Sequence, residues 1–290
     1  MTSRGPFDPV LFADRLLALR EQGGGSRDAL CPAWFGTALL FAPRVGSTQE
    51  EARRLLRGGA PDGTVVLAGE QTAGRGRRGR PWQSPAGLGI WMTVIVRPVP
   101  PPPASSLLAV AAAVAACQAV RRLGAGNVEI KWPNDLIAGR RKLGGVLGEI
   151  VADPDAASAL LGVGLNIGLD PSHLPPEVAA IATSLRNHGL ARAAESEDLV
   201  AGLVERMGAA FGELRRGRVD ALLDRWRSLS PTSAGTRVTV EDPGGARFSG
   251  TTRGITADGS LVLECADGHA REIRHGGSLS FEEVSNAPAH

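Results

Sequence analysis

The spacing of apolar residues changes near residue 236 of this 290-residue chain, and that change constrains the fold more than any other feature. Before it, β-branched stretches such as 64–71 and 87–98 alternate with helix-like stretches such as 48–57. After it, short strand-like stretches are separated by Asp-Gly and Gly-Gly turns. The pattern predicts an α/β (α+β) domain at 36–231 and a small β-barrel at 232–284, with an N-terminal extension at 1–35 and a tail at 285–290.

Composition argues against several classes of protein. The 32 basic and 30 acidic side chains are interspersed and leave a formal charge of +2, which is too small for a general nucleic-acid binder. Cys31, Cys117 and Cys265 are far apart and form no C-x-x-C pair, which argues against disulfides or a zinc site and favours a reduced, cytoplasmic compartment. The apolar run 107–120 is shorter than the ~18 residues that span a bilayer, so we expect a buried helix and no membrane partner.

Lysine is almost absent from the chain. Lys131 and Lys142 are the only two, and the other 30 of the 32 basic residues are arginine. An ammonium group is a compact point charge, whereas a guanidinium is a wide planar fork that can overfill a narrow pocket. Two lysines in one motif-like stretch, 130–145, therefore indicate a site for a small anionic reacting group. The alternative is chance survival of two exposed lysines.

The stretch 70–82, EQTAGRGRRGRPW, places three glycines and four arginines in seven residues directly after a predicted strand. It has neither the G-x-x-x-x-G-K-[ST] spacing of a Walker A loop nor the helix-opening G-x-G-x-x-G of a dinucleotide turn. Its glycines let backbone amides approach an anion, and its arginines offer paired donors to carboxylate or phosphate. We interpret it as an anion clamp that is mobile until a ligand arrives, with a solvated loop or a crude nucleic-acid patch as the alternative.

Other polar residues stand at predicted strand ends. The proline of KWPND bends the chain and presents Asn134 and Asp135 where Mg²⁺ or a ribose could be held, and a simple turn is the alternative. Ser47 and Thr48 lie at a strand-to-helix corner, where plain helix capping is the alternative to ligand binding. Asn166 follows two glycines in GVGLN, and these glycines could serve only close packing.

Taken in order and spacing, these stretches resemble the biotin protein ligases. The family pattern G-R-G-R-x-G-R-x-W is present at 74–82, K-W-P-N-D at 131–135, R-K-L-x-G at 141–145 and G-x-G-x-N at 162–166. The resemblance covers roughly residues 36–284. It implies a class II synthetase-like catalytic domain, in which helices flank a mixed sheet, followed by a small SH3-like β-barrel.

The resemblance implies an ATP-dependent reaction that makes biotinyl-5′-adenylate and then biotinylates one lysine of a biotin carboxyl carrier domain in a biotin-dependent carboxylase. ATP, Mg²⁺ and biotin are the implied cofactors and substrate, and cations are needed because two anions must meet. The implied catalytic residues are Lys142, Arg75, Arg77 and Lys131. The implied biotin site consists of Ser47, Thr48, Gln71, Gly74, Arg75, Arg77, Lys142 and Gly144. The implied ATP site consists of Arg77, Arg78, Arg80, Trp82, Lys131, Asn134, Asp135 and Asn166, with Asp135 as the Mg²⁺ ligand.

Two rival functions and two departures from the family stay open. A lipoate ligase would usually carry an R-R-x-S-G-G-G stretch, which is absent from this sequence. An RNA-binding module would carry aromatic side chains to stack bases, whereas aromatic residues make up only 4% of the chain. About 35 residues precede the first strand, too few for a helix-turn-helix, so we expect a monofunctional enzyme without sequence-specific DNA binding. Ile181 and Ala182 stand where some members have a tryptophan, which leaves the adenine-stacking residue open. We expect a monomer or a weak dimer.

Overall fold

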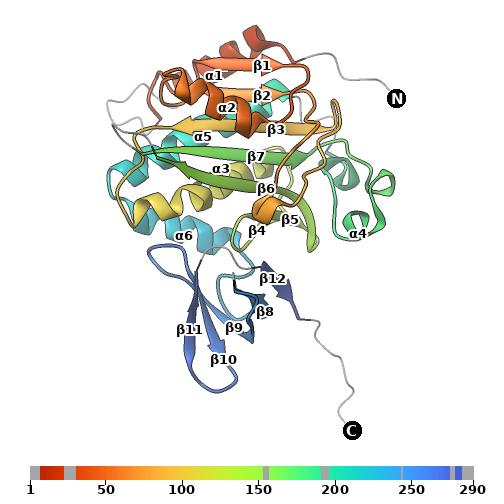
Figure 1. Cartoon of the computed structure of the whole chain (residues 1–290), viewed down its shortest axis with the longest axis vertical. Helices are drawn as coiled ribbons and strands as arrows, with labels where there is room; N and C mark the ends of the chain where they lie inside the picture. Colours follow the sequence, from red (N-terminus) through yellow and green to blue (C-terminus); the bar gives the residue numbers. More distant parts are fainter. Residues whose placement is uncertain are drawn as a thin grey trace.

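The structure is a computed structural model that describes residues 7–22, 31–152, 157–190, 196–242, 244–274 and 278–282. Figure 1 shows an α/β body above a smaller β-domain. Seven strands form the sheet of the α/β body in the order β1-β2-β3-β7-β6-β5-β4. Only β1 and β2 are parallel among these neighbours, so the sheet is mixed, as predicted. The strands are β1 (Leu39–Ala42), β2 (Val65–Ala68), β3 (Gly89–Val96), β4 (Val128–Lys131), β5 (Asp135–Ala138), β6 (Arg141–Val151) and β7 (Ser158–Asn166).

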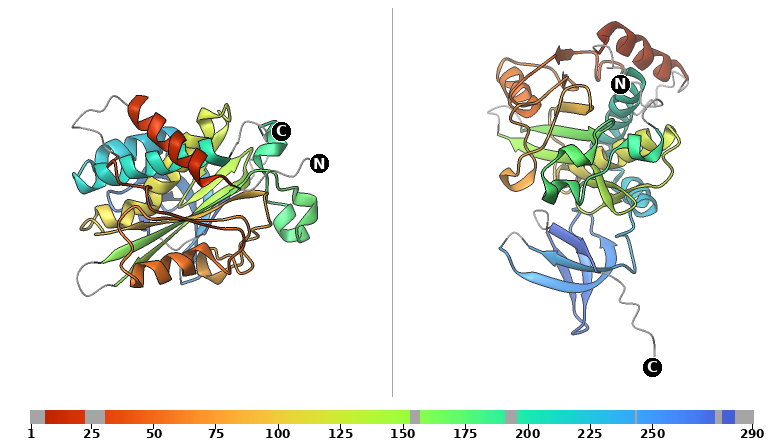
Figure 2. Two further views of the ribbon diagram at one scale, coloured as in Figure 1. Left: turned by 90° about the horizontal axis from the view of Figure 1, so that it is seen from above. Right: turned by 90° about the vertical axis from the view of Figure 1, so that its right-hand side faces the viewer.

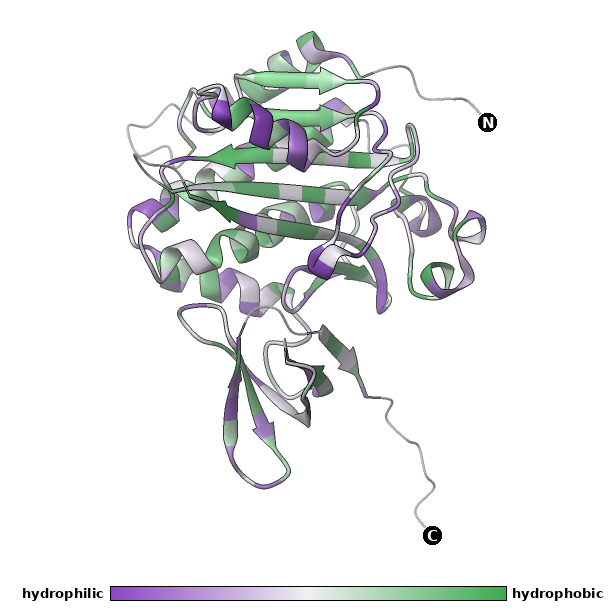
Figure 3. Cartoon of the chain, in the orientation of Figure 1, coloured by the Kyte–Doolittle hydropathy of each residue, from purple (hydrophilic) through white to green (hydrophobic). Residues whose placement is uncertain are grey.

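Helices cover both faces of this sheet, which explains why β2 and most of β3 are apolar on both sides (Figures 2 and 3). The helix α2 packs on one face through Ala52 and Leu56. A helical layer built around α3 covers the other face. The longer helices are α1 (Pro9–Gln22), α2 (Thr48–Arg57), α3 (Leu108–Arg122), α5 (Ser196–Arg215) and α6 (Val219–Leu229).

The alanine-rich α3 is a core helix, as predicted. The stretch Ala104–Arg122 has the length and hydropathy of a membrane span, but 72% of its apolar 18-residue window is buried inside the protein. Its small side chains let α3 lie close to β6 and β7. The burial therefore accounts for the hydropathy of this segment.

The described part of the predicted N-terminal extension packs on the α/β body. Phe12 and Leu16 of α1 are both only 2% exposed. Arg15 forms an ion pair with Asp198 of α5 at 3.0 Å. Residues 1–6 and 23–30 of this extension lie outside the described residues.

Apolar residues at three- and four-residue spacing predict helical structure over 176–229, which is correct for α5 and α6 but only partly correct before them. The short helices α4 (Pro176–Ala179) and η4 (Leu185–His188) flank an extended stretch. There Lys142 N donates to Ile181 O at 2.6 Å, and Thr183 N donates to Lys142 O at 2.8 Å. Because these backbone groups pair with the beginning of β6, they are not available for helical hydrogen bonds.

The C-terminal domain is a five-stranded antiparallel sheet in the order β11-β10-β9-β8-β12. Alternating side chains such as Val238 and Val240 are fully buried, which gives this small domain its core. The described strands agree with the predicted small β-domain. They are β8 (Arg237–Glu241), β9 (Arg247–Ile255), β10 (Leu261–Cys265), β11 (Ala270–Ile273) and β12 (Ser278–Phe281).

The segment SPTSAG at 230–235 has the composition of a linker, but Ser230 and Thr232 within it are buried. Thr232 is fully buried, and its hydroxyl oxygen accepts from Trp132 N at 3.3 Å. The fully buried indole of Trp132 donates from Nε1 to Gly259 O in the β9–β10 turn at 3.1 Å. The KWPND strand end is therefore fastened directly to the C-terminal domain.

Candidate active site

The arginine and glycine loop folds into a short hairpin next to the end of β4. Gly76 N donates to Arg80 O at 2.8 Å, and Trp82 N donates to Gly74 O at 2.9 Å. Arg78 has a left-handed backbone with φ 57°, within the 3₁₀ turn η1 (Arg77–Gly79). A methyl group on Gly74 would lie 2.5 Å from Trp82 O, so only glycine fits there.

Three arginines of the loop contact three different elements of the protein. Arg75 forms an ion pair with Glu50 of α2 at 2.7 Å. Arg77 Nη1 donates to Asn134 Oδ1 at 3.0 Å. The third contact joins Arg78 to the C-terminal domain, because its Nη1 lies 3.7 Å from Glu241 Oε1 in β8. Arg80, the fourth predicted anion-binding arginine, is exposed.

Burial of Arg77 lowers the pKa of its guanidinium from the ordinary arginine value, and the like charge of Arg78 adds to this. The carboxylate of Asp135 acts in the opposite direction. Since guanidinium groups stay protonated in proteins, Arg77 is a partly desolvated cation that faces the KWPND strand end. Such a cation attracts an anion more strongly than an exposed one.

The two lysines lie near one carboxylate although they are eleven residues apart in the sequence. Lys142 Nζ lies 2.7 Å from Asp135 Oδ1. Lys131 is the register partner of Asp135 across the β4–β5 hairpin, and Phe281 of β12 lies under its ammonium at 5.7 Å from the ring centroid. Burial lowers the pKa of Lys131, Asp135 partly offsets this, and the like charge of Lys142 lowers it again.

Trp82 lies against β7 and beside Lys142. The ammonium of Lys142 is 5.3 Å from the centroid of the Trp82 ring, within cation–π range. A methyl group on Gly164 would lie 2.6 Å from Trp82 Nε1, so the glycine is what lets the indole lie flat on the strand. Within the described residues, this buried Nε1 has no hydrogen-bond partner.

Polar side chains line the strand-to-helix corner before α2. The amide of Gln71 receives two hydrogen bonds from Thr48, from N at 2.8 Å and from Oγ1 at 3.0 Å. Gln71 Nε2 donates to Ser84 Oγ at 2.8 Å. The N-cap of α2 is the buried Ser47, whose side chain makes no capping hydrogen bond, so plain capping does not account for Ser47 or Thr48.

Sequence reasoning missed two members of this corner. The hydroxyl of Thr93 donates to Thr48 Oγ1 at 2.9 Å, and Ser84 accepts from Gln71. Thr93 interrupts the otherwise apolar run 90–96, and this interruption was the available signal. Ser84 had no comparable signal, because a serine beside a proline in a loop is ordinary turn composition.

The two predicted ligand-binding asparagines are both engaged by the protein. Asn134 is buried, donates from Nδ2 to Val146 O and accepts from Arg77. Asn166 Nδ2 donates to Thr183 O at 3.0 Å. Gly144, predicted on the biotin side, packs tightly on β7, because a methyl group there would lie 2.5 Å from Gly164 O.

In the described part of the chain, no group of three or more His, Cys, Asp or Glu side chains is placed to hold a metal ion. Among the described residues, Asp135 is the carboxylate that forms an ion pair with Lys142. One carboxylate together with phosphate oxygens is an ordinary Mg²⁺ environment, because Mg²⁺ keeps several waters and binds through few protein ligands.

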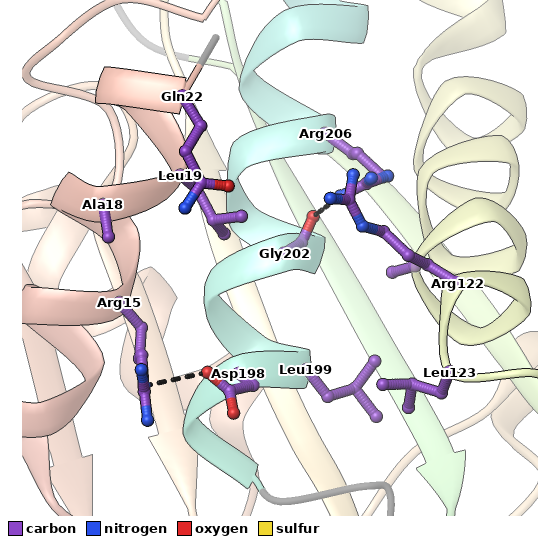
Figure 4. A pocket seen from close by; sticks show the side chains of 11 residues that line it. Arg15, Ala18, Leu19, Gln22, Arg122, Leu123, Asp198, Leu199, Gly202 and Arg206 are labelled. Carbon is purple, nitrogen blue, oxygen red and sulfur yellow. Dashed lines mark hydrogen bonds and ion pairs between the residues drawn. The ribbon is translucent and has the colours of Figure 1, made fainter.

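A separate hollow of about 270 Å³ lies between α1, α3 and α5 (Figure 4). The ion pair of Arg15 with Asp198 lies at one end, and Arg122 and Arg206 lie at the other. None of the predicted site residues lines it. The predicted residues instead gather around the loop, the KWPND strand end and the start of α2.

Comparison with known proteins matches both parts of the chain. The profile of the biotin/lipoate A/B protein ligase family matches residues 41–166, and that of the biotin protein ligase C terminal domain matches residues 234–281. The biotin--[acetyl-CoA-carboxylase] ligase of Mycobacterium tuberculosis is 37% identical over 245 residues, which cover 82% of this chain and 88% of that protein. The bifunctional ligase/repressor BirA of Bacillus subtilis is 34% identical over 238 residues, covering 80% and 71% respectively.

A similar fold occurs in a solved structure. Biotin protein ligase from Aquifex aeolicus in complex with biotin and ATP superposes with a TM-score of 0.72 at 23% identity, covering 85% of this chain and all of that one. This likeness confirms the predicted fold, an α/β body with a C-terminal β-domain.

Proposed function

This chain belongs to the biotin protein ligase family, and we propose that it activates biotin with ATP to biotinyl-5′-adenylate and then biotinylates a lysine of a biotin carboxyl carrier domain. The observation that carries the proposal is the convergence of Lys131, Lys142 and Arg77 around Asp135. Three cations beside one carboxylate leave an excess of positive charge. That excess matches a reaction in which a carboxylate must approach a triphosphate.

The first step would form a bond between a biotin carboxylate oxygen and the α-phosphorus of ATP and break the bond from that phosphorus to the bridging oxygen of pyrophosphate. Both reactants are anions, so preorganised cations lower the barrier most. We assign Lys142 to the point where the carboxylate meets the α-phosphate, and Lys131 to the phosphates. Mg²⁺, held by Asp135 and phosphate oxygens, would neutralise further phosphate charge.

In the second step, the amine of the carrier lysine would attack the acyl carbon, AMP would leave with the former α-phosphate, and the amine would lose a proton. The name of the mycobacterial relative, which specifies acetyl-CoA carboxylase, supports a carboxylase as the acceptor. No covalent bond to this chain is needed in either step.

We place the head group of biotin at the corner formed by Ser47, Thr48 and Gln71, because short hydroxyl and amide groups suit the edges of a cyclic urea. Backbone around Gly74 and the guanidinium groups of Arg75 and Arg77 complete this side. The nucleotide lies on the other side of Lys142, where Trp82 offers a ring face. Further groups assigned to the nucleotide are Arg78, Arg80, Asn134 and Asn166.

The alternative of lipoate as substrate comes from the shared family profile, which names both biotin and lipoate. The match of residues 234–281 to the biotin protein ligase C terminal domain favours biotin. The test is exchange of labelled pyrophosphate into ATP with each acid in turn. We expect exchange with biotin, and equal or faster exchange with lipoate would disprove biotin specificity. Transfer of labelled biotin to a carrier domain, with and without ATP, tests the second step.

A further inference from the structure

We propose that the hollow between α1, α3 and α5 is a binding site separate from the proposed active site, and that its ligand is a small carboxylate with an apolar body. The hollow has a volume of about 270 Å³ and shares no lining residue with the site assigned to biotin and ATP. Figure 4 shows α5 as its floor, with α1 and α3 as its two walls. The inference goes beyond the proposed function and does not depend on it.

Two arginines from different helices make one end of the hollow cationic. Arg206 belongs to α5, and Arg122 lies in the last turn of α3. Burial lowers the pKa of the Arg206 guanidinium, Glu205 partly offsets this, and the like charge of Arg122 lowers the pKa again. Since both guanidinium groups stay protonated in proteins, two cations that repel each other stand at this end.

The acidic groups near the hollow do not balance these two cations. Arg206 Nη1 lies 3.8 Å from the carboxylate of Glu205. Asp198, an acidic residue of the lining, is paired with Arg15 at the opposite end. Within the described ranges, the side chain of Arg122 has no ion pair or hydrogen bond. An anion could therefore bind here without displacing an acidic side chain, and guanidinium groups hold a carboxylate through paired hydrogen bonds.

A glycine in the middle of α5 leaves room at the floor of the hollow. Glycine in a helix interior destabilises the helix relative to alanine, so its presence calls for a reason. At Gly208 the reason is packing, because a methyl group there would lie 2.4 Å from Cys31 Sγ. A methyl group on Gly202 would meet only Arg206 Nη1 among the described side chains, at 3.4 Å. Gly202 is therefore not required by packing, and its missing side chain deepens the hollow beside Arg206.

Apolar side chains from all three sides line much of the remaining hollow. They include Leu19 of α1, Leu123 directly after α3, and Leu199 of α5. An inorganic anion bound to the arginines would leave these side chains in contact with water, whereas an apolar body attached to the anion would cover them. The volume is slightly below the ~300–1,000 Å³ of pockets for drug-sized ligands, so the ligand must be small. These walls favour a carboxylate with a hydrocarbon body over inorganic phosphate.

Octanoate is the probe for this site, and calorimetry measures its equilibrium binding. Octanol keeps the hydrocarbon body without the charge, and inorganic phosphate keeps a charge without the hydrocarbon body. We expect octanoate to bind more tightly than either compound. Shortening the chain to hexanoate should weaken binding, by up to roughly fourfold for each methylene group removed.

Arg122→Gln tests the cationic end of the hollow. We expect octanoate to bind roughly tenfold more weakly, because a charge-assisted contact is lost. Arg57→Gln is the matched control and should keep the wild-type affinity, since it removes an exposed arginine from the last turn of α2, on the other face of the sheet. Gly202→Leu places a side chain at the floor of the hollow and should abolish binding. Thermal melting shows whether each variant is folded, and the exposed Arg122 can be replaced without disturbing the core.

Lys142→Met separates this site from the proposed active site, where a carboxylate is also expected to bind. We expect this variant to retain the binding of octanoate that depends on Arg122. Binding that is lost in Lys142→Met and unchanged in Arg122→Gln would place octanoate in the active site and overturn the inference. Absence of octanoate binding in the wild type would overturn it too, as would octanol or phosphate that binds as tightly as octanoate.

Discussion

Lys142 and Asp135 form an ion pair, with Nζ 2.7 Å from Oδ1, on neighbouring strands of the sheet. A ligand carboxylate or phosphate that binds Lys142 therefore competes with Asp135 for the same ammonium group. An ammonium can hold several such oxygens at once, because it is a compact charge with three donors. Lys142, one of only two lysines in the chain, therefore stands where a compact cation could contact Asp135 and a ligand oxygen together.

The substitution Lys142→Arg tests whether shape matters at this position as well as charge. We expect adenylate formation to slow by about 10- to 150-fold, which corresponds to the loss of one charge-assisted contact of roughly 1.5 to 3 kcal/mol. Single-turnover rates at saturating biotin and ATP measure it, and thermal melting controls for folding. If Lys142→Arg retains more than about half of the wild-type rate, the presence of lysine at this position is a matter of chance and has no chemical cause.

The lowered pKa of Lys131 predicts an alkaline limit to catalysis. Burial is its main cause, so Lys131 loses its proton at a lower pH than an ordinary lysine. We expect kcat/KM for ATP to fall as the pH rises through this value, and Lys131→Arg to move that fall to higher pH at a milder cost in rate than Lys142→Arg. If kcat/KM falls at the same alkaline pH in the wild type and in Lys131→Arg, Lys131 is not the group that limits catalysis.

The lowered pKa of Lys131 also affects the free energy of unfolding, which should rise with pH where the rate of catalysis falls. Between the lowered pKa of folded Lys131 and its ordinary value, the unfolded chain binds more protons than the folded chain. The contribution of Lys131 to the free energy of unfolding therefore rises with pH in that window. Urea unfolding of the wild type and of Lys131→Met at several alkaline pH values measures this contribution. We expect the rise of the free energy of unfolding with pH to be missing in the variant.

The indole hydrogen bond of Trp132 predicts a specific cost at the domain junction. Trp132→Phe leaves the buried Gly259 carbonyl without its donor, so we expect a loss of roughly 1 to 3 kcal/mol beyond the effect of the smaller ring. Trp226→Phe is the matched control, because Trp226 is fully buried and its Nε1 has no partner among the described residues. Equal losses in urea unfolding would show that the Gly259 contact contributes nothing.

Contact between Gly164 and Trp82 predicts a defect in ATP binding. In Gly164→Ala the new methyl group would meet the indole at 2.6 Å, and the ring must move off β7. If Trp82 faces adenine, as proposed, KM for ATP should rise roughly tenfold. Gly168→Ala is the control, since its methyl group meets only Leu88 at 3.5 Å. Equal KM values for ATP in the two variants would remove Trp82 from the nucleotide site.

The arginine loop should exchange its amide hydrogens faster without ligand than with it. Exposed ion pairs such as that of Arg75 with Glu50 contribute little, so the hairpin opens readily. Biotin together with ATP should protect the amides of Gly76 and Trp82, while amides in the centre of β7 serve as the reference. Protection that is the same in both states would make the loop a rigid scaffold.

Local periodicity was enough to predict the α/β body, the buried α3 and the β-domain, whereas the mixed sheet was predicted through the resemblance to a family. The motif order was enough to predict which stretches meet, through resemblance to a family. It could not predict that Thr93 supports Thr48, because an apolar strand buried on both faces does not reveal which face a lone threonine occupies. It also could not predict that Ala182 pairs with Lys142, since that bridge joins segments far apart in the chain.

The junction between Trp132 and Gly259 has a consequence for how the two domains can evolve. The C-terminal domain contributes a main-chain carbonyl there, from a turn residue with φ 83°. Any sequence that keeps a glycine in that turn presents the same acceptor. Side chains of the β-domain can therefore diverge while the KWPND strand end stays in place, and a β-domain exchanged from a distant relative would have to preserve a backbone shape rather than a particular set of residues.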